Sequence, residues 1–420
     1  MHYFEYREGH LYCESVPIRE IIEKTETPVY VYSYKTLERH YQVFDRAFKK
    51  IPHLICYSCK ANSNIAVMSI FRNLGGGADI VSGGELYRAL KANIPADKIV
   101  YSGVGKTDEE LKSAINANIL MINIESEGEL DAIARISSRL KREVRVSIRV
   151  NPQIDPKTHP YITTGLKKNK FGIIWEDALR LYKKMKNHKY LKPVGISSHI
   201  GSQILELSPF LDAVRSLKDM LHELKGLGLE IKYFDIGGGL GITYKDEKAP
   251  HPEEYGDVII NEIKDLDVTL ILEPGRVIVG NSGILVTKVL YIKEVPGKMF
   301  LIVDAAMNDL IRPSLYSAYH EIAPIIDKRD FKRKKVDIVG PICESGDFFA
   351  KDRLLPEVEA GEFIALYSAG AYGFSMSSNY NSRPRPPEVL VKDDKFFVIR
   401  KRETKMDLIK GESIPDFLRV

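Results

Sequence analysis

The sequence predicts an α/β fold in which a (β/α)8 TIM barrel is followed by a mostly antiparallel β domain. Between residues 54 and 276, short apolar runs that end in small or polar residues alternate with segments of helical periodicity. Eight such units in roughly 220 residues match the size of a barrel, whereas a doubly wound sheet more often has about five to seven strands. After about residue 280, alternating β-branched runs with hairpin turns replace this pattern.

The barrel strands are expected at the apolar runs, and the helices where apolar residues recur every three or four positions. The expected strands are residues 54–60, 78–82, 99–102, 120–125, 144–151, 194–199, 233–237 and 269–273. The clearest helices are expected at residues 84–91, 108–116, 127–140, 175–186 and 209–227.

The last third of the chain predicts a second domain made of strands. They are expected at residues 284–295, 299–303, 336–339, 362–367 and 388–400, the last interrupted by a turn. Two early β-like segments, 10–16 and 28–34, are expected to join them. We therefore expect an N-terminal segment at 1–35 that packs partly on the β domain, a barrel at 36–280, and a C-terminal β barrel or sandwich at 281–420.

The charge balance argues against nucleic acid as a partner. The chain has 61 Lys+Arg and 57 Asp+Glu, and no basic run is interleaved with aromatic residues. The basic cluster at residues 328–335 is interpreted as a solvated surface. No uncharged stretch approaches the ~18 residues of a membrane span, and no signal peptide is recognised, so we expect a cytoplasmic protein without a membrane partner.

The four cysteines are too sparse for a disulfide framework in a chain of 420 residues, so reduced thiols are expected. Cys56 and Cys59 have the spacing of half a zinc or redox motif, but no second CxxC exists. Residues three apart on a strand also point to opposite faces. No metal site is predicted.

Lys60 follows the apolar run 54–57 and precedes small and polar residues. A lysine at a strand end is a candidate for Schiff-base chemistry, although a lone lysine usually faces water. Its neighbours at the other strand ends favour the chemical interpretation. In a barrel these ends share one face, and they carry Asp79, Asn151, His199, the triplet at 237–239, and Glu273.

A phosphate site is expected at the same face. The glycine triplet follows the seventh strand, and the loops after strands seven and eight are the usual phosphate seat of a barrel. Glu273 and Arg276 come next to it in the segment Glu-Pro-Gly-Arg. An amine, a carboxylate and a phosphate cradle are the parts that hold pyridoxal phosphate, with Glu273 keeping the pyridine nitrogen protonated. His199 is expected to lie flat against the ring, and Ser202 to donate to the phosphate.

The β domain offers further candidates. Arg312 and Tyr316 combine a bidentate donor with a phenol, which suits a carboxylate. Cys343 provides an acid or nucleophile beside Glu344, and Tyr372 lies in a glycine-flanked loop.

Eight motifs, in this order, resemble those of the diaminopimelate decarboxylases, which belong to the fold-type III pyridoxal-phosphate enzymes and join an alanine-racemase-like barrel to a β domain. The motifs are YSCKAN (57–62), GGADIVSGGE (76–85), HIGSQ (199–203), GGG (237–239), EPGR (273–276), RPSLY (312–316), CESGD (343–347) and GAY (370–372). The resemblance runs through nearly the whole chain.

The resemblance implies that Lys60 carries the cofactor, that His199 stacks on its ring and that Glu273 pairs with its nitrogen. The further cofactor-binding residues that it implies are Asp79, Ser202, Gly238, Gly239, Gly275, Arg276 and Tyr372. The substrate-binding residues that it implies are Arg276, Arg312, Tyr316, Glu344 and Tyr372. Cys343, with Lys60 as the alternative, is the implied proton donor, and the Cys343 loop is implied to enter the partner's site in a homodimer.

The implied activity is the decarboxylation of meso-2,6-diaminopimelate to L-lysine, the last step of lysine biosynthesis. One alternative is a decarboxylase of ornithine, arginine or carboxynorspermidine, in which Glu344 and the arginines would have no distal amino acid group to bind. Another is a non-catalytic cofactor-binding protein, and a third is a cofactor-free Schiff-base aldolase.

Overall fold

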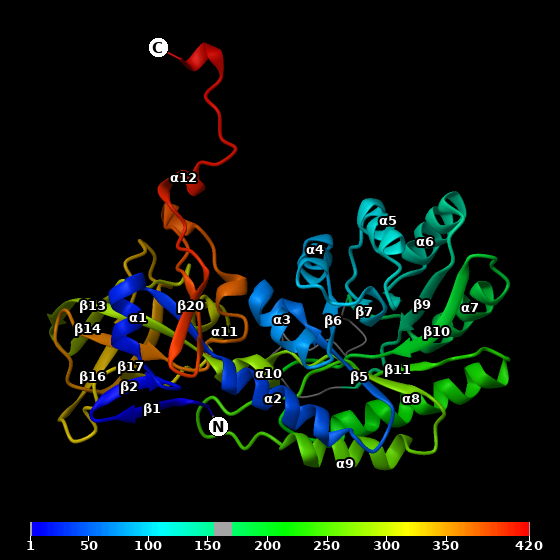
Figure 1. Ribbon diagram of the computed structural model, residues 1–420, viewed down its shortest axis with the longest axis horizontal. Helices are drawn as coiled ribbons and strands as arrows, with labels where there is room; N and C mark the ends of the chain where they lie inside the picture. The colour runs from blue at the N-terminus through cyan, green and yellow to red at the C-terminus, as the bar shows by residue number, and fades with distance from the viewer. Residues whose placement is uncertain (1, 155–169, 420) are drawn as a thin grey trace. The chain divides into compact units, whose positions relative to one another are not determined.

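The computed structural model describes residues 2–154 and 170–419, and the chain divides into two compact units (Figure 1). The barrel unit comprises Leu37–Gly280. The β unit comprises Met1–Thr36 together with Asn281–Val420.

The barrel unit is a closed ring of eight parallel strands in the order β10-β11-β12-β5-β6-β7-β8-β9. The strands are β5 (His53–Ser58), β6 (Gly77–Ile80), β7 (Ile99–Tyr101), β8 (Met121–Ile124), β9 (Val144–Arg149), β10 (Leu191–Ser197), β11 (Tyr233–Asp235) and β12 (Thr269–Leu272). Closure of the ring pairs β12 with β5, with Leu272 opposite Ile55. The predicted barrel is confirmed, and several strands end earlier than predicted because the chain turns at the polar residues that follow them.

Helices alternate with the strands around the ring (Figure 1). They are α2 (Tyr34–Ala47), α3 (Ile65–Asn73), α4 (Gly83–Lys91), α5 (Asp108–Ala117), α6 (Glu127–Leu140), α7 (Trp175–Lys186), α8 (Ser208–Gly226), α9 (Pro252–Ile263) and α10 (Arg276–Val279). Ser82 and Ser126 accept hydrogen bonds from backbone N–H groups in the first turns of α4 and α6, and Thr107 forms a capping box with Glu110 at α5. These caps set where each helix starts after its strand.

The β unit contains a sheet of mixed, mostly antiparallel pairing in the order β17-β16-β14-β13-β4-β19-β20, with β18 bridging β13 and β15. Its strands are β4 (Val29–Ser33), β13 (Gly283–Val295), β14 (Lys298–Val303), β15 (Ile322–Pro324), β16 (Arg333–Val339), β17 (Phe348–Pro356), β18 (Phe363–Leu366), β19 (Glu388–Lys392) and β20 (Lys395–Arg400). β4 lies between β13 and β19, so a strand from the N-terminal segment is central to the sheet. A small sheet of β1 (Phe4–Arg7), β2 (His10–Cys13) and β3 (Val16–Pro17) completes the unit.

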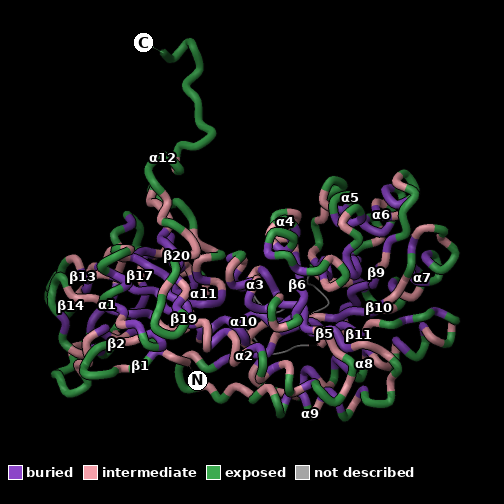
Figure 2. The backbone as a smooth tube through the Cα atoms, in the orientation of Figure 1, coloured by how far each residue is buried: buried purple, intermediate pink, exposed green. Residues whose placement is uncertain are grey.

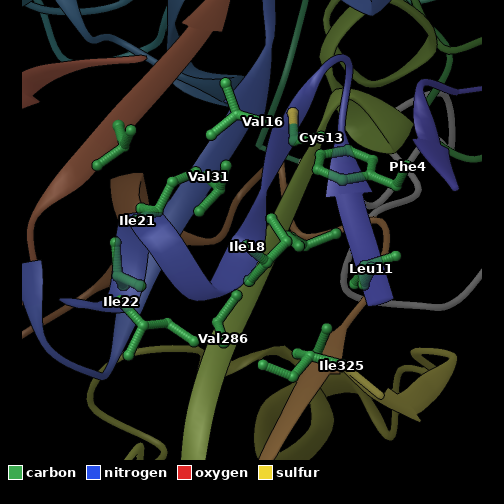
Figure 3. Packing of buried hydrophobic residues seen from close by; sticks show 14 of the residues in the cluster. Phe4, Leu11, Cys13, Val16, Ile18, Ile21, Ile22, Val31, Val286 and Ile325 are labelled. Carbon is green, nitrogen blue, oxygen red and sulfur yellow. The ribbon is translucent and has the colours of Figure 1, made fainter. Parts of the chain in front are cut away.

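A hydrophobic core holds the N-terminal segment to the later strands of the β unit (Figure 3). Helix α1 (Ile18–Thr25) buries Ile18, Ile21 and Ile22 in it. Val31 of β4 and Val286 of β13 pack in the same cluster and are fully buried. Burial of such side chains stabilises the fold by about 1.5–3 kcal/mol each.

The β unit also contains short helical segments, which are α11 (Arg312–Tyr316), η4 (Phe374–Met376), η5 (Tyr380–Ser382), α12 (Lys405–Leu408) and η6 (Asp416–Leu418). From α12 onward the chain is exposed along almost its whole length (Figure 2). Among the described residues, no helix combines the length and apolar character that a membrane crossing requires.

Candidate active site

Lys60 does not lie on a strand but in a short 3-10 helix, η1 (Cys59–Ala61), directly after β5. Its side chain is 36% exposed, and Nζ lies 3.2 Å from Oδ2 of the fully buried Asp79. Ser58 Oγ donates to the same carboxylate oxygen at 2.6 Å. Oδ1 of Asp79 has no hydrogen-bond partner within the described part of the chain. Asp79 therefore holds the lysine amine while one of its buried oxygens stays available for a further partner.

Glu273 follows β12 and is buried beside Asp235, the last residue of β11. The two carboxyl groups share a hydrogen bond. Burial, then the charges of Asp235 and Asp79, raise the pKa of Glu273 well above its usual value. Burial also raises the pKa of Asp235 to about 6. The pair therefore retains a proton in a pH range where exposed carboxyl groups have lost theirs.

A chain of buried amide and hydroxyl groups surrounds this pair. Asn123 Nδ2 donates to Asp235 Oδ2 at 3.1 Å and to Ser102 Oγ at 3.0 Å. Ser102 Oγ in turn lies 3.4 Å from Glu273 Oε1. Polar side chains of β8, of β11 and of Ser102, which directly follows β7, thus fix the orientation of Glu273.

His199 follows β10, and its Nδ1 accepts a hydrogen bond from the backbone N–H of Gly238 at 3.2 Å. This bond requires an unprotonated Nδ1, so the ring hydrogen of the neutral form lies on Nε2. Burial, with the nearby charges of Arg149 and Lys60, holds the pKa of His199 well below its usual value. The imidazole is therefore neutral at physiological pH.

The backbone of the turn at residues 237–239 packs closely against the backbone at Glu273 and at Gly201. A Cβ on Gly238 would lie 2.1 Å from the Glu273 carbonyl oxygen, and one on Gly239 would lie 2.6 Å from that of Gly201. Gly239 also has φ +113°, a conformation that side chains disfavour. Only glycine fits here, and the turn is tied to Glu273 because Glu273 N donates to Gly237 O at 2.8 Å.

Arg276 is the first residue of α10 and is 7% exposed, and Gly275 caps that helix. Arg276 Nη2 donates to Ser202 Oγ at 3.1 Å, and Arg276 Nη1 donates to the Tyr244 hydroxyl at 2.6 Å. Ser202 and Arg276 therefore place a hydroxyl and a guanidinium side by side, a donor set that suits a phosphate or carboxylate.

Three further residues support this site and were not predicted from the sequence: Arg149, Glu125 and Asp235. Arg149 Nη1 lies 3.0 Å from Glu125 Oε1, and both side chains are buried. Arg149 Nη2 lies 3.4 Å from the His199 carbonyl oxygen. Each of the three residues stands at the end of an apolar run, and this position could have indicated a place at the barrel mouth. Asn151 lies two residues after β9, and it holds a loop, because its Oδ1 accepts from Gln153 N and its Nδ2 donates to Phe171 O.

The candidates of the β unit form a second group. Ser314 Oγ of α11 donates to the Gly346 carbonyl at 2.6 Å, so the Arg312 helix and the Cys343 loop are adjacent. Arg312 is 5% exposed, whereas Cys343 and Glu344 are exposed and Tyr316 is half-buried. Glu344 hydrogen-bonds the Tyr380 hydroxyl. Tyr372 is half-buried and has φ 57°.

The predicted site residues thus fall into two sets, one in each unit. The barrel set joins Lys60, Asp79, His199, Glu273 and the residues around the glycine turn, and the β set joins Arg312 with the Cys343 loop. The barrel set offers an amine, a buried carboxyl pair, a neutral imidazole and an anion-binding corner.

Comparison with known proteins defines the class. The family model described as "Pyridoxal-dependent decarboxylase, pyridoxal binding domain" matches residues 34–280. The chain is 51% identical over 404 residues to the diaminopimelate decarboxylase of Aquifex aeolicus, covering 96% of this chain and 95% of that protein. It is 46% identical to that of Vibrio cholerae, covering 99% of both chains. The chain therefore belongs to the diaminopimelate decarboxylase family of the pyridoxal-dependent decarboxylases.

Solved structures agree with this assignment. The diaminopimelate decarboxylase from Helicobacter pylori complexed with L-lysine superposes with a TM-score of 0.91 at 46% identity, covering 94% of this chain and 99% of that one. The enzyme from M. jannaschii superposes with a TM-score of 0.94 at 41% identity, covering 99% of both chains. The resemblance stated from the motifs is confirmed.

Proposed function

We propose that this chain converts meso-2,6-diaminopimelate to L-lysine and CO2 with pyridoxal phosphate as its cofactor, as the last step of lysine biosynthesis. The observation that most supports this is the Lys60–Asp79 pair beside the buried Glu273, in a chain 51% identical to a diaminopimelate decarboxylase. The lysine bound by the Helicobacter pylori relative is the product that this reaction would release.

The residues present fit pyridoxal phosphate. Oδ1 of Asp79 is buried and has no hydrogen-bond partner within the described ranges, as expected of an atom that meets a polar ligand. Gly238 and Gly239 leave the room that a Cβ would fill, and Ser202 with Arg276 offers donors for a phosphate. We propose that Gly275 and Tyr372 complete the phosphate site.

When bound, pyridoxal phosphate supplies a ring that withdraws the electron pair released as CO2 leaves. In our proposal Lys60 would hold the cofactor through its amine, and Asp79 keeps that amine in place. Glu273 would hold a proton at the pyridine nitrogen, and the neutral His199 would help to hold the ring. Arg149 supports His199 through the histidine carbonyl.

The final proton is proposed to come from the Cys343 thiol, with Lys60 as the alternative donor, and it goes to the carbon that has lost CO2. A cysteine delivered by a second copy of the chain fits the family resemblance. Light scattering should therefore report a dimer, and a monomer at micromolar concentration would count against the shared site.

We propose that substrate specificity comes from residues that bind the distal amino acid group of the substrate. Arg276, Arg312, Tyr316 and Tyr372 are proposed to bind the distal carboxylate, and Glu344 the distal ammonium. A substrate that ends in a bare cation gives Arg312 nothing to bind. Ornithine and arginine are therefore disfavoured as substrates.

The deciding experiment measures CO2 release from meso-diaminopimelate, LL-diaminopimelate, lysine, ornithine and arginine in parallel. The meso isomer should react fastest, and the LL isomer, which lacks a D-centre, should not react. Loss of the visible absorbance of the lysine-bound cofactor on borohydride treatment should accompany loss of activity. Equal rates with ornithine would overturn the substrate assignment, and an absence of that absorbance in cofactor-saturated protein would overturn the cofactor assignment.

Glu273→Ala separates the role of Glu273 in chemistry from a role in cofactor binding. We expect turnover to fall by roughly a hundredfold, the usual effect of losing one preorganised group, while cofactor content changes little. Equal losses of turnover and cofactor would contradict the role assigned to Glu273.

A further inference from the structure

A buried histidine in the β unit contacts Arg312. The side chain of His320 is fully buried, and its Nε2 lies 2.9 Å from Nη1 of Arg312. The other ring nitrogen, Nδ1, lies 2.8 Å from the carbonyl oxygen of Tyr367. Nothing in the sequence pattern singled out His320.

The two partners determine where the ring hydrogen lies. A carbonyl oxygen only accepts, so Nδ1 must carry the hydrogen that points to Tyr367. A guanidinium only donates, so Nε2 must be an unprotonated acceptor for Arg312. Both contacts are satisfied together only by a neutral ring with its hydrogen on Nδ1.

His320 is itself anchored by two strands of the sheet. Tyr367 directly follows β18, and Arg353 of β17 donates from Nη1 to the His320 carbonyl oxygen at 2.9 Å. The guanidinium of Arg353 also lies 4.1 Å from the ring centroid of Tyr319. Because the imidazole is fixed to the sheet, its contact with Arg312 also fixes the side chain of Arg312 relative to the sheet.

The backbone of Arg312 is also held, because its carbonyl accepts from the N–H groups that end α11. A guanidinium has five N–H donors in one plane, so the contact with His320 fixes the plane of the whole N–H fork. Fixing the plane of that fork reduces the side-chain freedom that is lost when a ligand binds.

We propose that His320 is a positioning residue that orients Arg312 toward the distal carboxylate of the substrate. This inference rests on the proposed function, in which Arg312 binds that carboxylate. The ligand class it selects is an amino acid whose far end carries a carboxylate, and L-lysine retains that group as product.

Two substitutions separate the two ring nitrogens. His320→Asn keeps a donor near the Nδ1 position, which faces Tyr367, but it removes the acceptor for Arg312. His320→Gln places an amide oxygen near the Nε2 position and so keeps that acceptor. In the holoenzyme we expect His320→Asn to raise the KM for meso-diaminopimelate and the Kd for L-lysine by up to about tenfold, because Arg312 must then lose on binding the side-chain freedom that His320 otherwise removes beforehand.

His320→Gln should stay within about threefold of the wild type in both constants, because it retains the acceptor. Cadaverine, which lacks the carboxylate, should bind all three proteins alike. Weakening of L-lysine binding to the same degree in both variants would show that His320 only fills space, and it would overturn the proposal. A kcat loss without a change in KM would do the same.

Arg312→Gln distinguishes failure of this inference from failure of the proposed function. If Arg312→Gln leaves the Kd for L-lysine unchanged, the substrate role of Arg312 is wrong. If it weakens binding while His320→Asn does not, only the positioning role is wrong. Nitrogen-15 NMR of histidine-labelled wild-type holoenzyme needs no variant to fold. It should show His320 as the Nδ1–H tautomer at neutral pH, and any other protonation state would refute the proposal.

Discussion

Asp235 and Glu273 share a hydrogen bond between two carboxyl groups in the interior of the barrel. Such a bond requires a proton, and burial raises the pKa of both groups. The pair also interacts through charge with groups on neighbouring elements, which are Asp79, Lys60, Cys56 and Tyr255. The cofactor nitrogen would therefore meet a carboxyl group whose proton affinity is set by Asp235 as well as by burial.

The first prediction concerns Asp235→Asn in cofactor-stripped protein. Since the folded pKa of Asp235 is raised from 3.8 to about 6, its contribution to stability is complete below pH ~4 and is lost as the pH rises toward 6. The wild type should therefore lose about 1.4 kcal/mol per pH unit in this window from Asp235. The asparagine variant should lack this loss.

The measurement is urea unfolding between pH 4 and 7. The difference in unfolding free energy between variant and wild type should grow in favour of the variant as the pH rises. Asp309→Asn is a control in the other unit, because burial raises the pKa of Asp309 to about 7. The pH range over which Asp309 lowers stability should therefore extend to a higher pH than that of Asp235. Parallel pH profiles for the wild type and Asp235→Asn would rule out the shared proton.

The barrel was predictable because its strands are apolar runs closed by polar residues, and its helices carry caps such as Thr107 and Ser126. In the β unit, β1, β15 and β17 were missed. β15 is only three residues long and includes Pro324, and β17 carries charged residues in its middle. Pairing with β18 and β16 overrides these unfavourable local preferences.

The chemical residues Lys60 and Glu273 were predictable because barrel chemistry gathers at strand ends. Their partners were not. The contact between Asp235 and Glu273 joins different strands, and the contact of His320 with Arg312 depends on a buried ring orientation. Such pairings arise from tertiary packing, which periodicity and motif order do not encode.

The second prediction compares two glycine substitutions. Gly238→Ala places a methyl group 2.1 Å from the Glu273 carbonyl oxygen, so the backbone must move, at a cost of about 1–3 kcal/mol or more. Gly128→Ala adds a methyl group in the first turn of α6 with nothing within 4 Å, so it should not destabilise the protein. Unfolding and cofactor titration of both variants check this. Unchanged cofactor affinity in Gly238→Ala would contradict the proposal that the glycine turn at residues 237–239 helps to bind the cofactor.

The third prediction concerns thiol accessibility. Cys343 is exposed, whereas Cys13, Cys56 and Cys59 are buried, and burial raises the pKa of each buried thiol. Iodoacetamide should therefore alkylate the native protein at Cys343 first, as mass spectrometry of peptides can show. L-Lysine should slow the reaction in the holoenzyme if Cys343 is close to the substrate. Rapid alkylation of Cys56 or Cys59 would contradict the buried environment.

The fourth prediction concerns the buried pair of Glu125 and Arg149, whose charged atoms lie 3.0 Å apart. Glu125 also accepts from Gly103 N at 2.8 Å and from Gly172 N at 3.1 Å. Glu125→Gln leaves the buried Arg149 without a carboxylate, which should cost about 3–5 kcal/mol of unfolding free energy. Urea unfolding at pH 7 measures this cost.

The matched control is Glu127→Gln, because the partner of Glu127 is the exposed Arg180, and exposed pairs contribute little. Although burial alone would raise it, the charges of Arg149 and Lys106 hold the pKa of Glu125 below its usual value. This stabilisation is present above the unfolded pKa and is lost as the pH falls through the folded one. The deficit of Glu125→Gln should therefore shrink in acid. A constant deficit from pH 7 to pH 3 would show that lost packing, and not the lost charge, destabilises the variant.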